Sequence, residues 1–274
     1  MTAGSCVNID KNIISNYKRN YKGKSIINLG TPGSLPLFEL IKLKEYVYSK
    51  PNYKKPKKFY WLYYEGNDLR ELNNFYKGYK STYISNYLND PNFSQKLKII
   101  DDQRNEELNK SLNYVIGLIE KKNDNIQLHK YKLRHFLTFA KIRTFIKNFL
   151  FSEKQNIDTN TLKLFKNIIK LSKNIIEKNN AELIFVYLPT IERYKKFTVY
   201  NFKINGSSLL DKKLKYKEVI KMLNKLEIKT LDIKSQVFDK EKDALSLFPL
   251  RKHHHYNPKG YKKVASFIFK STIN

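Results

Sequence analysis

The sequence predicts an α/β protein in which helices cover both faces of a doubly wound parallel sheet. Short apolar runs bounded by turn residues alternate with amphipathic helical patterns, and this alternation is typical of parallel strands joined by right-handed crossovers. The runs are almost wholly apolar, as expected of strands that are buried on both faces. The predicted strands are residues 25–29, 59–64 (FYWLYY), 183–188 (LIFVYL) and, with a weaker pattern, 228–233.

Apolar residues three and four positions apart predict the helices between these strands. The last helix has the clearest boundary, because Asn257 is a typical cap and Pro258 suits the first turn. The apolar positions that define the four helices are Leu37, Leu40, Ile41 and Val47; Leu164, Ile168, Leu171 and Ile175; Tyr216, Val219, Ile220 and Leu223; and Tyr261, Val264, Ala265 and Ile268.

The 274 residues carry no internal repeat and no Gly/Ser linker, so we interpret residues 1–274 as a single α/β domain. Residues 93–180 lack a strand pattern and are too long for a simple connection, which predicts a helical insertion within that domain. Residues 128–151 of this insertion mix basic and apolar side chains. A helix packed on the sheet is favoured there over one that lies in a membrane interface.

The composition excludes several classes of protein. With 41% hydrophobic residues the chain is not a disordered basic tail, and no apolar run approaches the roughly 18 residues of a membrane span. The first residues do not resemble a signal peptide, which favours a cytoplasmic or membrane-peripheral protein over a secreted one. Cys6 is the only cysteine, so a disulfide framework and a CxxC metal site are excluded.

The formal charge of +28, from 53 basic and 25 acidic residues, would attract phosphate backbones and anionic lipid. The lysines are scattered among many Asn, Ile, Tyr and Phe residues instead of clustering as arginines with aromatics. This pattern indicates that the excess of lysine follows from an A/T-rich genome and not from selection for a basic binding surface. A nucleic-acid partner is therefore disfavoured, and association with a membrane surface stays open.

Three short blocks follow predicted strands or precede the last helix. They are residues 28–33 (NLGTPG), 65–68 (EGND) and 253–261 (HHHYNPKGY). Open α/β sheets bind their ligands at the carboxyl ends of the strands, where these blocks are expected. Each block alone also has a purely structural reading, since glycines make turns, Asn67 can cap a helix and a histidine is often structural.

In this order the blocks resemble those of the SGNH hydrolases, also called GDSL-type lipases and esterases. The resemblance covers residues 1–92 and 181–270, and the stretches YYEGNDLREL and HYNPKGYKKVASFI look like bacterial members often found among surface-polysaccharide genes. It implies a flavodoxin-like sheet with strand order 2-1-3-4-5. It also implies a serine esterase or acyltransferase that acts on an ester-bearing substrate, plausibly an acylated carbohydrate, without a cofactor.

The resemblance assigns Gly33 and Asn67 to the oxyanion hole and His255 to the role of catalytic base. The chemistry is consistent with these assignments, because a backbone N–H and an amide NH2 stabilise the negative oxygen formed during acyl transfer. A serine hydroxyl needs an imidazole to take its proton near neutral pH. A metal site at the three consecutive histidines is disfavoured, since their side chains point in different directions and no carboxylate is nearby in sequence.

The sequence departs from the family pattern at the acid of the triad. That acid usually lies three residues before the histidine, a position that Lys252 occupies here. Asp243 or another carboxylate would then have to orient the imidazole of His255.

The sequence also contains no Gly-Asp-Ser, the block that carries the nucleophile. Residues 1–4 (MTAG) fit the register directly after such a block, so we expect an upstream strand that ends in Gly-Asp-Ser and lies between residues 25–29 and 59–64. A stop codon directly before Met1 would contradict this expectation. Two other classes stay open: a non-catalytic relative that binds or scaffolds, and a basic protein that binds a membrane surface or nucleic acid.

Overall fold

The computed structural model describes most of the chain outside one long internal segment. Residues Met1–Ser94 and Ile157–Asn274 form one compact unit, and the second unit, Gln95–Asn156, lies outside the described residues. The described ranges are 7–21, 25–31, 33–47, 56–78, 83–90, 92–94, 157–199, 202–205 and 214–272.

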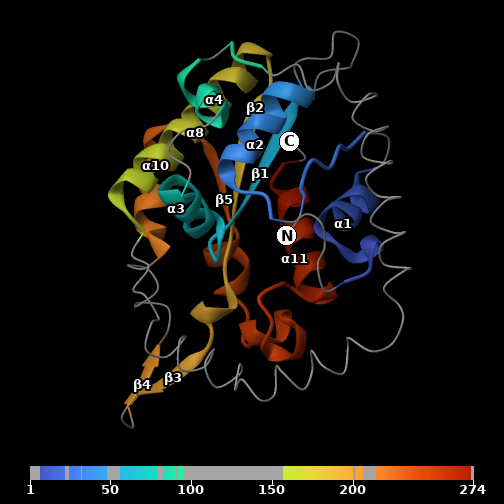
Figure 1. Cartoon of the computed structure of the whole chain (residues 1–274). Coiled ribbons are helices and arrows are strands. Elements are labelled where there is room, and N and C mark those ends of the chain that lie inside the picture. Colours follow the sequence, from blue (N-terminus) through green and yellow to red (C-terminus); the bar gives the residue numbers. More distant parts are fainter. Residues whose placement is uncertain are drawn as a thin grey trace, which may run out of the picture. The chain divides into compact units, whose positions relative to one another are not determined.

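Three parallel strands form the central sheet (Figure 1). They are β1 (Lys58–Tyr64), β2 (Glu182–Leu188) and β5 (Lys229–Asp232), in the order β1-β2-β5. Trp61 pairs with Phe185, and Phe185 pairs with Thr230. The predicted strands 59–64, 183–188 and 228–233 are therefore confirmed.

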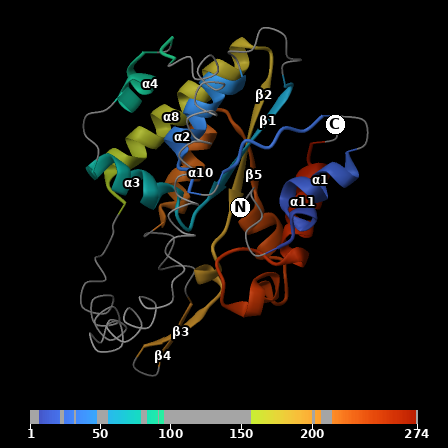
Figure 2. The same ribbon diagram turned by 45° about the vertical axis from the view of Figure 1, so that its right-hand side comes forward.

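Helices cover both faces of this sheet (Figures 1 and 2). One face packs against α2 (Pro36–Lys42), α3 (Asp68–Gly78), α8 (Thr159–Lys178) and α10 (Tyr216–Lys225), and the other packs against α1 (Ile13–Asn20) and α11 (Pro258–Lys270). Because neighbouring strand residues point to opposite faces, Phe185 and Tyr187 lie in the first core, and Ile184 and Val186 lie in the second. The α/β class is confirmed.

The remaining elements are short. They are the helix α4 (Asn86–Asn89), the antiparallel strands β3 (Lys196–Val199) and β4 (Phe202–Asn205), two π-helical turns (Leu43–Val47 and Lys234–Phe238), and 3₁₀ turns at Ile9–Lys11, Tyr83–Ser85, Ile191–Arg193, Ala244–Leu247 and Pro249–Arg251. The sequence analysis did not predict β3 and β4, because four residues per strand are too few to show an alternating pattern.

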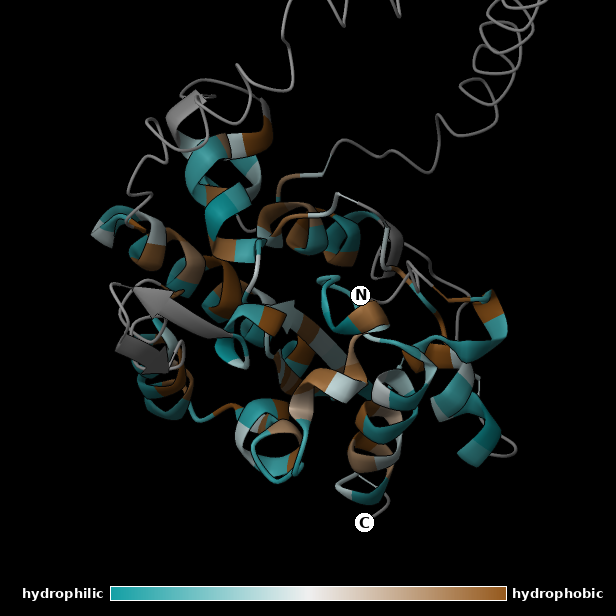
Figure 3. Cartoon of the chain, turned by 90° about the horizontal axis from the view of Figure 1, so that it is seen from below, coloured by the Kyte–Doolittle hydropathy of each residue, from teal (hydrophilic) through white to brown (hydrophobic). Residues whose placement is uncertain are grey.

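The N-terminal cap of α11 is confirmed in atomic detail. Asn257 Oδ1 accepts a hydrogen bond from the backbone N–H of Gly260 at 3.0 Å. A Cβ atom on Gly260 would lie 2.6 Å from the carbonyl oxygen of Leu247, so only glycine allows the first turn of α11 to pack this closely. Figure 3 shows helices that alternate between hydrophilic and hydrophobic residues, as their amphipathic patterns require.

The prediction of a strand at residues 25–29 is wrong. These residues have no regular secondary structure, and the side chains of Ile27 and Leu29 are 55% and 37% exposed. An isolated strand has no ladder of hydrogen bonds to stabilise it, and no described strand pairs with this segment. In the described part of the chain, β1 pairs with β2 alone and is an edge strand.

The predicted insertion at 93–180 lies mainly outside the described residues, and so does the amphipathic segment 128–151. Its last part is α8, which packs on the sheet through Phe165, Ile168 and Ile169. No helix within the described ranges has the length and apolar character needed to cross a membrane.

Candidate functional site

Loops at the carboxyl ends of β1 and β2 meet the histidine loop that precedes α11. Tyr64, the last residue of β1, donates a hydrogen bond from its hydroxyl to the carbonyl oxygen of His254 at 2.9 Å. The same hydroxyl lies 3.2 Å from Thr190 Oγ1, two residues after β2. The segment that carries Asn67 is thereby joined to the segment that carries His255.

Asn67 lies at the start of α3, where its backbone carbonyl accepts a hydrogen bond from Glu71 N at 2.7 Å. Its amide nitrogen Nδ2 donates to Glu71 Oε1 at 2.8 Å, and its Oδ1 is buried without a hydrogen-bond partner. A side-chain amide has two N–H hydrogens, so one donor remains after the bond to Glu71. That remaining donor is what the predicted oxyanion hole requires.

Gly33 lies in the turn that leads into α2. Its φ of +69° is in the left-handed region, which favours glycine, and no atom of the described residues lies within 4 Å of the position that a Cβ would occupy. Lys42 Nζ stabilises the same loop through Leu29 O at 3.1 Å and Thr31 Oγ1 at 2.6 Å. The open space around Gly33 is consistent with close approach of a ligand to the backbone.

Two buried carboxyl groups, Glu39 of α2 and Asp68 of α3, lie close enough to influence each other electrostatically. Asp68, at the start of α3, accepts a hydrogen bond at Oδ2 from Tyr64 N at 2.8 Å. Burial, followed by the nearby charge of Glu39 from α2, raises the pKa of Asp68 above its usual range. Burial also raises the pKa of Glu39 to about 7, against the opposing charge of Lys42. Glu39 Oε2 is buried and has no hydrogen-bond partner.

His255 is half-buried, and its Nδ1 atom is buried and has no hydrogen-bond partner within the described part of the chain. Burial lowers the pKa of His255, and the neighbouring His254 lowers it further, which favours the neutral imidazole that a general base requires. The backbone on its carboxyl side is fixed, because the buried Tyr256 donates from its hydroxyl to Pro189 O at 2.7 Å.

The structure does not place a carboxylate at Nδ1 of His255. Asp243 instead binds the guanidinium of Arg251 through two hydrogen bonds of 2.7 and 2.8 Å, and Lys252 is exposed. The carboxylate that contacts the histidine loop is Glu192, whose Oε1 lies 3.3 Å from His254 Nδ1. Sequence reasoning missed Glu192, although its place four residues after β2 is where strand-end residues reach a site.

A buried ion pair lies beneath these loops. Arg193 Nε donates to Glu65 Oε1 at 2.6 Å and to Oε2 at 2.7 Å, and both side chains are fully buried. Tyr187 Oη and Thr190 N also donate to the Glu65 carboxylate, each at 2.6 Å. Burial raises the pKa of Glu65, and Arg193 acts in the opposite direction. Glu65 directly follows β1, whereas Arg193 lies five residues after the end of β2, so no local sequence pattern marks the two as a pair.

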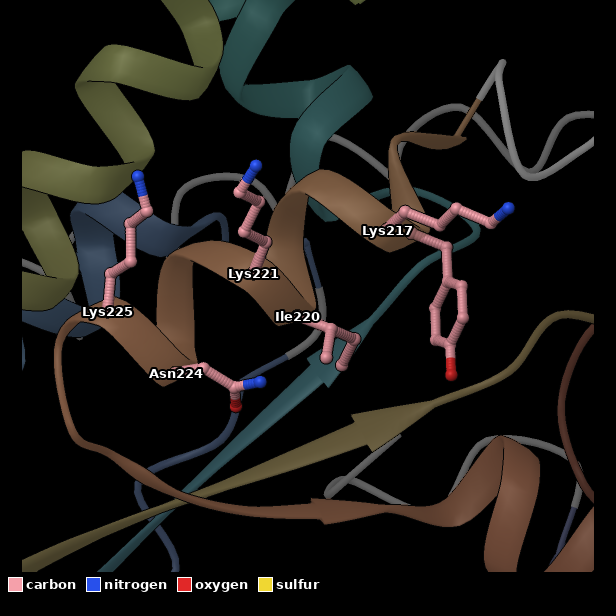
Figure 4. Close-up of a pocket in the computed structure, with 6 residues that line it drawn as sticks. Lys217, Ile220, Lys221, Asn224 and Lys225 are labelled. Atoms are coloured by element: carbon pink, nitrogen blue, oxygen red, sulfur yellow. The ribbon is translucent and has the colours of Figure 1, made fainter.

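Two surface hollows lie on helices outside this cluster of loops. One, of about 490 Å³, follows α10 and is lined by Tyr216, Lys217, Ile220, Lys221, Asn224 and Lys225 (Figure 4). The other, of about 470 Å³, lies against α11 and includes Lys240, Lys259, Lys262, Lys263 and Lys270. Neither is lined by Gly33, Asn67 or His255.

Among the residues that the structure describes, no three His, Cys, Asp or Glu side chains gather closely enough to hold a metal ion. Comparisons with protein families, with characterised proteins and with solved structures found no match for this chain.

Proposed function

We propose that the loops around Gly33, Asn67 and His255 form an acyl-transfer site of the SGNH hydrolase type. The observation that supports it most is the hydrogen bond between Tyr64 and His254, which joins the Asn67 segment to the His255 segment across 190 residues of sequence. Buried polar atoms without a hydrogen-bond partner among the described residues, at Asn67 and His255, are consistent with it, although Trp61, Tyr63 and Ser172 in the core carry such atoms too. An ester of a carbohydrate is the substrate class that the resemblance favours.

In the proposed reaction a serine hydroxyl attacks the carbonyl carbon of the ester while Nε2 of His255 takes its proton. The negative oxygen of the tetrahedral intermediate accepts hydrogen bonds from Gly33 N–H and from the second N–H of Asn67 Nδ2. The intermediate collapses, the alcohol leaves with the proton from His255, and an acyl-serine remains. Water completes a hydrolysis, and a sugar hydroxyl completes a transfer.

The proposed nucleophile belongs to a further parallel strand that pairs with the open edge of β1. All seven residues of β1 except Lys58 are apolar or aromatic, and no strand within the described residues pairs with its outer edge. Proteins normally cover an apolar edge of this length. With the further strand, β1, β2 and β5 would correspond to strands 3, 4 and 5 of the flavodoxin-like order, whose strand 2 is not supplied by residues 25–29.

The test uses a serine-bearing chain, in which a strand that ends in Gly-Asp-Ser precedes Met1. Hydrolysis of p-nitrophenyl acetate is compared with a version in which that serine is alanine. We expect His255→Ala to lower the rate by roughly 10²–10⁴-fold and Asn67→Ala by on the order of 10². His253→Ala is the matched control for reaction of surface imidazoles with the ester. Equal rates in the serine and alanine versions would exclude the esterase proposal.

A non-catalytic protein with the same fold is the second candidate. Lys252 stands at the usual position of the acid, and His255 Nδ1 has no hydrogen-bond partner, so the imidazole lacks the support that a triad provides. This candidate predicts that the serine-bearing chain folds with full cooperativity and has no esterase activity above that of its alanine version.

A further inference from the structure

Four residues form a closed ring of contacts at the carboxyl ends of β1 and β2, and His254 takes part through both its backbone carbonyl and its side chain. The Tyr64 hydroxyl bonds to His254 O at 2.9 Å and lies 3.2 Å from Thr190 Oγ1. Thr190 Oγ1 donates to Glu192 Oε2, and the other oxygen of Glu192 lies 3.3 Å from His254 Nδ1. The ring therefore holds His254 by its backbone and by its side chain at the same time.

The ring is buried on the side of the sheet and exposed to solvent at His254. Tyr64 and Thr190 are buried at 8% and 2% exposure, whereas the His254 side chain is 63% exposed. Because Tyr64 belongs to β1, its hydrogen bond to His254 restrains the surface loop relative to the sheet. The carbonyl of His254 is part of the peptide unit that continues into His255, and a bond to that oxygen restrains the orientation of the next residue.

The loop needs such restraint. Leu250 and Arg251 have φ angles of 50° and 55°, a left-handed conformation that is costly for residues other than glycine. Nδ1 of His255 has no hydrogen bond that could fix its imidazole. The orientation of His255 therefore depends on its backbone, which the ring holds before it and Tyr256 holds after it.

We propose that Tyr64, Thr190, Glu192 and His254 position His255, and that they do so in place of the carboxylate absent at Lys252. This inference rests on the proposed function of His255 as the base. His254 and Glu192 are positioning residues, since they act on His255 through the backbone and not on the substrate. Thr190 orients the Glu192 carboxylate, and Tyr64 connects the loop to the sheet.

The first test needs no activity and uses the chain as it stands. Hydrogen exchange is measured at the amides of His253 and Asn257, which bond to Pro249 O and Leu247 O on either side of the loop. Tyr64→Phe removes the hydroxyl, and with it the bond to His254, but keeps the aromatic side chain in the core. We expect this substitution to raise hydrogen exchange at these amides about tenfold. Tyr60→Phe is the matched control, because it removes a hydroxyl from the same strand that bonds Tyr17 instead. No change with Tyr64→Phe, or an equal change with Tyr60→Phe, would overturn the proposal.

The remaining members of the ring give a graded result. Thr190→Val should raise exchange in the loop, and Thr190→Ser should leave it near the original rate because the hydroxyl is kept. Glu192→Ala should raise it severalfold, while Glu241→Ala, which breaks the ion pair with Lys263 on α11, should leave the loop amides unchanged. Loss of protection in Thr190→Ser equal to that in Thr190→Val would contradict the role of the hydroxyl.

The second test uses the serine-bearing chain and separates this inference from the proposed function. Tyr64→Phe should lower kcat roughly tenfold to a hundredfold with KM nearly unchanged, since a misplaced base affects the chemical step. An unchanged kcat would overturn the positioning role. If the serine-bearing chain has no activity at all, the proposed function fails, and hydrogen exchange alone decides whether the ring restrains the loop.

Discussion

The two halves of the carboxyl edge of the sheet differ in how their polar groups are satisfied. Around Glu65, each carboxylate oxygen accepts hydrogen bonds from Arg193 and from a group near β2, and all of them are buried. Around Asn67, polar atoms of Asn67, His255 and Glu39 are buried and have no hydrogen-bond partner. The central residues of the two halves, Glu65 and Asn67, are separated in sequence by a single glycine.

This difference separates structural from functional roles. A satisfied buried network stabilises the fold, and removal of one member leaves the others unpaired. Buried polar atoms without partners cost free energy of folding, so they are expected where a substrate or a further segment completes the contacts. The comparison predicts that substitutions in the first half lower stability and that substitutions in the second half lower activity.

The largest effect is expected at the ion pair. Glu65→Ala leaves the Arg193 guanidinium buried without its carboxylate, and the free energy of unfolding should fall by about 3–5 kcal/mol. Urea unfolding measures this loss. Asp243→Ala, which breaks an exposed ion pair with Arg251, is the control and should cost less than about 1 kcal/mol. Similar losses in both variants would contradict the structural role of the buried pair.

A smaller loss of stability is expected when Gly66, the glycine between Glu65 and Asn67, is substituted. A Cβ on Gly66 would lie 2.5 Å from the Tyr64 ring, so Gly66→Ala must displace that ring and its bond to His254. We expect a loss of about 1–3 kcal/mol together with faster amide exchange in the histidine loop. Gly66→Ala combined with Tyr64→Ala should recover part of the loss in the double variant, since the clash is then absent. A double variant whose loss is the sum of the two single losses would speak against the clash.

The pH dependence of stability tests whether the buried carboxyl group of Glu39 is held in its protonated form. The folded pKa of Glu39, about 7, is above the ordinary value, so its contribution to stability is complete at low pH and is lost as pH rises through 7. Between pH 5 and pH 8 this loss is on the order of 1–2 kcal/mol. Glu39→Gln should remove that part of the pH dependence in unfolding experiments. An identical pH profile for Glu39→Gln would show that the carboxyl group is not held in its neutral form.

The smallest effect on stability is expected at the proposed catalytic groups. Asn67→Ala removes one partly buried hydrogen bond to Glu71 and a buried oxygen without a described partner, and His255→Ala removes a half-buried imidazole, so each should change the free energy of unfolding by about 1 kcal/mol or less. The lowered pKa of His255 means that its contribution to stability is complete above the ordinary histidine pKa and falls as pH drops through 6.5. His255→Ala should lack this decline in unfolding measured between pH 8 and pH 5.

The sequence predicted those parts of the fold that depend on local pattern. The strands around Trp61, Phe185 and Leu231 and the cap at Asn257 follow from short apolar runs and from one side chain at a helix start. Residues 25–29 show the limit of that reasoning, because an apolar run becomes a strand only when another strand pairs with it.

The contacts of the site depend on pairs that lie far apart in the chain. Glu65 and Arg193 are 128 positions apart, and no periodic pattern links two such residues. Glu192 and His254 were missed for the same reason, since a carboxylate can reach a histidine loop from any neighbouring strand end. The sequence indicated Gly33, Asn67 and His255 through a family resemblance, and the side chains that hold these residues in place became visible only in the folded chain.

The acyl-enzyme itself provides the most direct test of the proposed site. The serine-bearing chain is incubated with p-nitrophenyl acetate, quenched in acid, and its mass and acylated residue are determined by mass spectrometry. We predict one acetyl group on the serine of Gly-Asp-Ser, formed rapidly in the original sequence and in His253→Ala and lost in His255→Ala. Acetylation that proceeds equally without His255, or that appears only on surface lysines, would contradict the account.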